Sequence, residues 1–166
     1  NYLVLFRDGD AKTIGNSLLI ASVSTAAAMF FGTLCAYSIA RFRTGGDNFA
    51  MWVLSNRMLP PIVSVIPLFI IARSLGVFDT PWLLIAIYAL SGLPFVVWVM
   101  RVFIQDVPKS IEEAAMIDGC GRYEVFFRIT LPLVVPGLAA VLVIIFMFSW
   151  NEYLFASMLT SSQAKT

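Results

Sequence analysis

The sequence predicts an all-α fold, a polytopic bundle of membrane-spanning helices, from its composition and from the spacing of its charges. Of the 166 residues, 60% are apolar and only 13% are charged, and the mean hydropathy is +0.87. A soluble domain is about a quarter charged. The charges also divide the chain into uncharged runs that reach the roughly 20 residues a helix needs to cross a bilayer. We therefore expect residues 1–166 to form one transmembrane domain.

Four spans are predicted from these runs, at about 16–40, 49–72, 80–102 and 130–151. The second run is interrupted by Arg57 and by three prolines: Pro60, Pro61 and Pro67. Its helix should be kinked or locally unwound there, because proline removes a backbone donor and crowds the preceding turn. The first run is rich in small residues between Ala21 and Ala28, which allow close helix packing in lipid.

Lys and Arg collect in two loops, which predicts the orientation of the chain. The loop after the first span holds Arg41 and Arg43, and the loop after the third, at about 103–129, holds Lys109 and Arg122 among others. Cytoplasmic loops carry the excess of basic residues, so we expect both loops to be cytoplasmic. The loop at 103–129 is the only sizeable polar loop, and a soluble partner would dock there.

Several kinds of chemistry are excluded. The chain has no histidine, the commonest general base and metal ligand, and Cys35 and Cys120 match no zinc or redox spacing. We expect no metal site. A net charge of +1 gives no basic field for nucleic acid. The sequence contains no G-x-x-x-x-G-K-S/T phosphate loop. We therefore expect that the chain is not an enzyme and cannot hydrolyse ATP by itself.

The loop at 103–129 predicts two short helices joined by a turn. Ser110 and Glu113 have the spacing of a capping box at a helix start. Asp118 and Gly119 should end this helix, with Gly119 in a left-handed conformation, and a second helix should begin after Gly121. By its composition alone, this hairpin could instead be an amphipathic segment lying on the membrane surface.

The same hairpin resembles the EAA signature of binding-protein-dependent ABC importer permeases. The residues that carry the resemblance are Glu113-Ala114-Ala115, Gly119 and Ile129-Thr130-Leu131-Pro132. Leu59-Pro60-Pro61, Leu93-Pro94-Phe95 and Trp150-Asn151-Glu152 resemble the carbohydrate-uptake branch, specifically the second permease of maltose-type systems. The resemblance covers nearly the whole chain from Asn16. Such permeases usually have six spans, so we expect one span before Asn1 and one after Thr166.

The resemblance implies a function and a set of partners. The chain would be half of a translocation pathway in a bacterial or archaeal plasma (inner) membrane. Its partners would be a second homologous permease, two ATP-binding-cassette ATPase subunits and an extracytoplasmic solute-binding protein. It would bind no cofactor itself, because ATP and Mg belong to the ATPases. The loop would be a coupling helix that docks into an ATPase through Glu113, Ala114, Ala115, Asp118 and Gly119.

Polar residues at membrane depth are costly, and they therefore indicate a solute pathway. The candidates, which combine hydrogen-bonding groups with aromatic faces, are Asn56, Arg57, Tyr88, Ser91, Trp150, Asn151 and Glu152. Alternative interpretations stay open for three of them. Arg57 could form a structural ion pair or extend its guanidinium to the inner lipid headgroups. Asn151 and Glu152 could mark an interfacial helix end.

Two other classes of function compete with the importer permease. An ion-coupled secondary transporter would need charged residues in several spans, and only Arg57 is so placed. An intramembrane enzyme would need a base or paired carboxylates. Within the importer class, sugars, sugar alcohols, oligosaccharides and a non-sugar solute such as glycerol phosphate all remain open.

Overall fold

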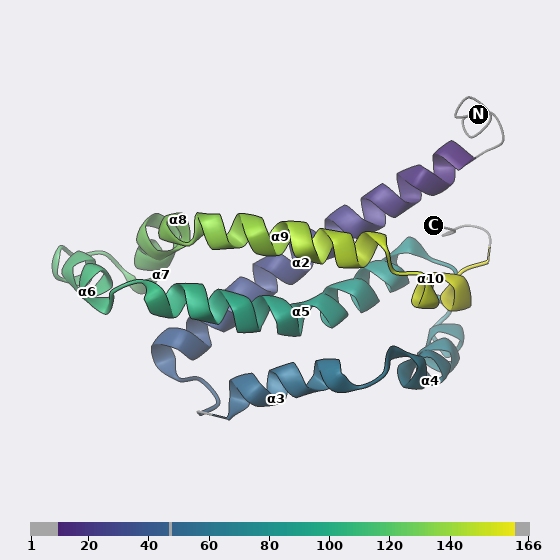
Figure 1. Cartoon of the computed structure of the whole chain (residues 1–166), viewed down its shortest axis with the longest axis horizontal. Coiled ribbons are helices and arrows are strands. Elements are labelled where there is room, and N and C mark those ends of the chain that lie inside the picture. The colour runs from purple at the N-terminus through teal and green to yellow at the C-terminus, as the bar shows by residue number, and fades with distance from the viewer. Residues whose placement is uncertain (1–9, 47, 162–166) are drawn as a thin grey trace.

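The structure, a computed structural model, describes residues 10–46 and 48–161, and every regular element in them is a helix. The predicted all-α membrane fold is confirmed. Within this part of the chain, two helices are long and apolar enough to cross a membrane, α2 (Asp10–Phe42) and α5 (Pro81–Asp106). Two bent helix pairs raise the number of candidate spans to four if each pair is one span. Figure 1 shows α2, α5 and α9 (Val135–Trp150) lying against one another.

Small residues determine how closely α2 and α5 pack. Ala21, Ser24, Ala28 and Ala36 lie on the buried face of α2. Gly32 lies on the same face, and a Cβ added there would come within 2.6 Å of the Val96 side chain of α5. Without a hydrophobic drive between helices in lipid, such close backbone approach supplies the packing energy. The small residues of the first run therefore serve a contact within this chain.

The second predicted span is bent by 87° between α3 (Phe49–Ser55) with its 3₁₀ turn (Asn56–Met58) and α4 (Pro61–Ser74). The predicted interruption is confirmed at Leu59 and Pro60, which take extended conformations. Pro67, in contrast, lies inside a continuous α4.

The fourth predicted range, 130–151, contains a break as well. α7 (Arg122–Val125) continues through a π-helical turn (Phe126–Thr130) into α8 (Leu131–Leu133). The chain then bends by 74° into α9. Pro132 and Pro136 flank the bend and each removes a helical donor. The helix that would carry the fourth span is therefore the 16-residue α9, followed by α10 (Leu154–Leu159).

The two loops that were predicted to be cytoplasmic lie at the same end of the bundle. In Figure 1 the turn between α2 and α3 lies near α6 (Lys109–Ile117), α7 and α8, whereas α4 and α10 lie at the opposite end. At that opposite end, the Asp79 carboxylate accepts hydrogen bonds from the backbone and hydroxyl of Ser161, both at 2.9 Å. The arrangement agrees with the predicted topology, in which the loops after the first and third spans share one side.

Candidate functional site

The first helix of the loop, α6, does not begin with the predicted capping box. Its N-cap is Pro108, and no side chain caps it. The reason is that Pro108, with φ −59° and ψ 126°, starts the helix two residues earlier than the sequence suggested, so that Ser110 lies inside the first turn. Glu113 is then past the first turn and free of a capping role.

The end of α6 agrees with the prediction for Gly119. Gly119 has a φ of +93°, and its N–H donates to Met116 O at 3.1 Å while Cys120 N–H donates to Ala115 O at 3.0 Å. These two bonds form a Schellman motif, which satisfies the last carbonyls of the helix. The next helix, α7, begins after Gly121, whose N–H donates to the Glu124 carboxylate at 3.0 Å.

The two faces of α6 differ in chemistry. Glu113, Ala114 and Ile117 are exposed, and Ile117 has 86% of its surface exposed. Ala115 was expected to dock a partner, but its side chain is buried within this chain at 7% exposure. Glu112 also faces inward. The surface available to a partner is thus a carboxylate, a small residue and a large apolar side chain at the tip of the loop.

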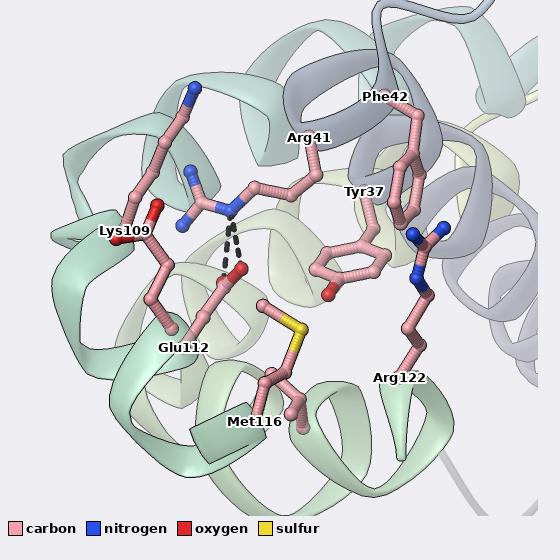
Figure 2. Close-up of a pocket in the computed structure, with 9 residues that line it drawn as sticks. Tyr37, Arg41, Phe42, Lys109, Glu112, Met116 and Arg122 are labelled. Atoms are coloured by element: carbon pink, nitrogen blue, oxygen red, sulfur yellow. Dashed lines mark hydrogen bonds and ion pairs between the residues drawn. The ribbon is translucent and has the colours of Figure 1, made fainter. Parts of the chain in front are cut away.

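Glu112 is held by a buried polar network, of which Figure 2 draws the pair of Arg41 and Glu112. The Arg41 Nε lies 2.9 Å from both Glu112 carboxylate oxygens, and the two side chains are only 5% and 7% exposed. Arg41 Nη2 also donates to Val107 O at 2.9 Å. The Thr130 hydroxyl donates to Glu112 Oε1 at 2.7 Å. This network joins the end of α2, the end of α5, α6 and the turn that leads into α8.

A hollow of about 230 Å³ opens beside this network, between α2, α6 and α7. Figure 2 shows Tyr37 and Phe42 from α2 facing Met116 from α6 and Arg122 from α7. The Arg122 guanidinium lies over the Phe42 ring at 5.2 Å. The hollow lies between the loop and the last turns of α2.

The predicted solute-pathway residues fall into two groups. In the first, Arg57 Nη1 donates to the backbone oxygen of Ser91 at 3.0 Å. Its guanidinium lies 5.6 Å from the centroid of Phe95 and 4.9 Å from that of Phe148. Within the described residues, Arg57 has no ion-pair partner. The guanidinium therefore contacts protein and keeps donors free.

Asn56 does not join this first group. Its side-chain amide donates to Trp52 O of its own helix at 3.0 Å, which satisfies one of the carbonyls at the end of α3.

The second group lines a hollow of about 160 Å³ that brings together Tyr88, Trp150, Asn151 and Glu152. The Tyr88 hydroxyl donates to Glu152 O at 3.4 Å. Two of these side chains also cap helices: Asn151 Nδ2 donates to Met147 O at 2.7 Å, and the Glu152 carboxylate accepts from Leu154 N and Phe155 N. The open interpretation of Asn151 and Glu152 as a helix end is supported by these bonds.

Comparison with known proteins identifies the family. The model of the family described as "Binding-protein-dependent transport system inner membrane component" matches residues 28–164. This chain belongs to that family. It is 41% identical over 150 residues to the inner membrane ABC transporter permease protein YcjP of Escherichia coli, a match covering 89% of this chain and 53% of YcjP. The chain thus spans about half the length of such relatives.

Some relatives of similar sequence are named for the transport of a carbohydrate. The trehalose transport system permease protein SugB of Mycobacterium tuberculosis is 35% identical, over 99% of this chain and 61% of SugB. A chain in the crystal structure of a bacterial ABC transporter involved in the import of the acidic polysaccharide alginate superposes with a TM-score of 0.76. That match has 23% identity and covers 91% of this chain and 53% of the other, so it supports the fold alone.

Sequence reasoning missed three residues of the loop network. The sequence analysis used Arg41 only for its charge and Thr130 only as part of the signature, and it did not single out Glu112. Their sequence signal is weak, because Arg41 and Glu112 are 71 residues apart. The one available clue was a second carboxylate beside Glu113 in a chain with few charges.

Proposed function

We propose that this chain is a transmembrane permease subunit of an ATP-binding-cassette importer for a sugar or related polyol. The observation that carries the proposal is the α6–α7 hairpin, whose tip exposes Glu113, Ala114 and Ile117 and is closed by the turn at Gly119. The family supports the membrane role, and in this proposal ATP hydrolysis belongs to a separate subunit.

The hairpin has the properties of a coupling element. Small residues at its tip permit close approach by a partner surface, and Glu113 can meet a cation there. Asp118 and Gly119 form the exposed turn beside them. An exposed apolar side chain such as Ile117 favours a protein interface. The full transporter would contain a second homologous permease, two ATPases that bind ATP and Mg, and an extracytoplasmic binding protein.

A carbohydrate is the solute class that the interior groups favour. Arg57 keeps free donors beside the Ser91 backbone oxygen, and the rings of Phe95 and Phe148 lie next to its guanidinium. Sugar hydroxyls need such donors, and the C–H face of a sugar ring needs an apolar surface. Relatives named for trehalose and diacetylchitobiose transport support the same class. Tyr88 and Trp150 in the second hollow would supply further contacts.

The test changes the tip of the loop in the full-length permease. Ile117→Glu places a charge on an apolar side chain that is 86% exposed and should not disturb folding. We expect the variant permease to reach the membrane at the parental level but to lose ATPase co-purification in native detergent. The matched control is Leu75→Glu, an exposed leucine (69%) at the end of α4, the helix at the opposite end of the bundle in Figure 1. Parental ATPase recovery with Ile117→Glu would contradict docking at this tip.

A further inference from the structure

α6 has little apolar surface to hold it in place. Of its nine residues, only Glu112 and Ala115 are buried. Ala115 contributes one methyl group, so the burial that normally anchors an amphipathic helix is small. The contacts that fix the position of α6 are therefore largely those of the Glu112 carboxylate.

The Glu112 carboxylate connects α6 to three other parts of the chain. Through Arg41, at 2.9 Å, it reaches the last turn of α2. The same guanidinium donates to Val107 O, where α5 ends. Through the fully buried Thr130, at 2.7 Å, the carboxylate reaches the π-helical turn that leads into α8 and α9.

The chemistry of this network argues against a role in stability alone. A buried ion pair has a desolvation cost that its attraction often fails to exceed, and apolar residues of similar size are frequently as good or better for stability. Charge-assisted bonds do supply fixed direction and length, above all when a guanidinium and a carboxylate make several of them. A helix held this way moves together with the helices to which it is bonded.

We propose that Arg41, Glu112 and Thr130 are positioning residues that transmit movement of α6 to α2 and α9. The proposal rests on the proposed function, in which α6 docks on an ATPase, and it adds the path inside the permease. Glu113 and Ala114 would hold the partner on the outer face of α6, and Glu112, on the inner face, would carry the displacement into the bundle. The connection to α2 matters because α2 packs along α5 through its small residues.

The test removes the charges of Arg41 and Glu112 together, so that neither is left buried without its partner. The double variant Arg41→Met/Glu112→Leu keeps apolar bulk at both positions in the full-length permease within its assembled transporter. We expect at least half the parental ATPase recovery, because the outer face is unchanged, and at least a tenfold drop in solute transported per ATP hydrolysed. A purely structural role would lower assembly and leave this ratio unchanged.

The matched control lies in the same loop. Arg128 forms an exposed ion pair with Glu124 at 3.2 Å, and such pairs contribute little. Arg128→Met should therefore keep the parental transport ratio. If the double variant fails to assemble, the single variant Arg41→Lys tests the role of the network instead. It keeps the charge but loses the multiple bonds of the guanidinium, so we expect parental assembly and a several-fold lower ratio.

The outcomes separate the two proposals. A parental transport ratio in an assembled Arg41→Met/Glu112→Leu transporter, or in Arg41→Lys, would overturn the role of this network. If Ile117→Glu nevertheless abolishes ATPase recovery, the docking function stands and only the internal path is wrong. If both sets of variants behave like the parent, the loop is not the coupling element.

Discussion

Replacing Gly119 tests the turn at the tip of the loop by backbone strain alone. Its φ is +93°, and a Cβ built on it meets nothing within 4 Å. Gly119→Ala therefore creates no clash, and its cost is the strain of a residue with a Cβ at positive φ, about 1–2 kcal/mol. That free energy lowers the population of the turn by a factor of about 5–30 relative to other loop conformations.

The consequences should be local. The turn is outside the candidate spans, so membrane insertion of the full-length permease should stay at the parental level. ATPase co-purification and solute uptake should fall several-fold for Gly119→Ala and close to background for Gly119→Val, because β-branched residues are least tolerant of positive φ. The three measurements are membrane level, ATPase recovery in native detergent and solute uptake.

Gly121 provides the matched control two residues away. It has φ −70° and ψ 160°, a conformation open to any residue, and its added Cβ would lie 3.8 Å from Glu124 Oε2, an ordinary contact. Gly121→Ala should match the parent in all three measurements. Parental uptake by Gly119→Val would refute the reasoning that this turn shapes a coupling element. Equal losses in the Gly119 and Gly121 variants would show that bulk matters and strain does not.

Two further predictions concern the bundle. Gly32→Ala drives a methyl group to 2.6 Å from Val96, so it should destabilise the protein by about 1–3 kcal/mol and lower its thermal midpoint in detergent. Gly15→Ala on the same helix meets nothing within 4 Å, and an equal midpoint for the two variants would contradict the close α2–α5 packing. Arg57→Gln removes the guanidinium that lies beside the rings of Phe95 and Phe148 and should reduce solute uptake at least several-fold at parental ATPase recovery. Unchanged uptake would exclude Arg57 from the pathway.

Some features of the candidate site depend on residues that are neighbours in the sequence, and others depend on the packing of distant segments. The helix end at Gly119 and the helix start at Gly121 could be predicted because both depend on backbone preferences of a few neighbouring residues. The predicted capping box at Ser110 was wrong because Pro108 is the N-cap of this helix. The prediction considered the spacing of Ser110 and Glu113 and did not take Pro108 into account. Glu112 could not be recognised as buried, because Glu112 and Glu113 are equivalent until packing decides which one faces inward.

The sequence by itself determined the membrane class, the all-helical fold, the interruption before Pro61 and the position of the loop. These follow from hydropathy, charge spacing and proline geometry, which can be read along the chain within the length of one span. Only the tertiary structure decided that Arg41 and Thr130 converge on Glu112, that Ala115 is buried, and that Arg57 lies beside Phe95 and Phe148. These contacts join residues far apart along the chain, and the rotation and crossing of packed helices, which no local pattern encodes, set their positions.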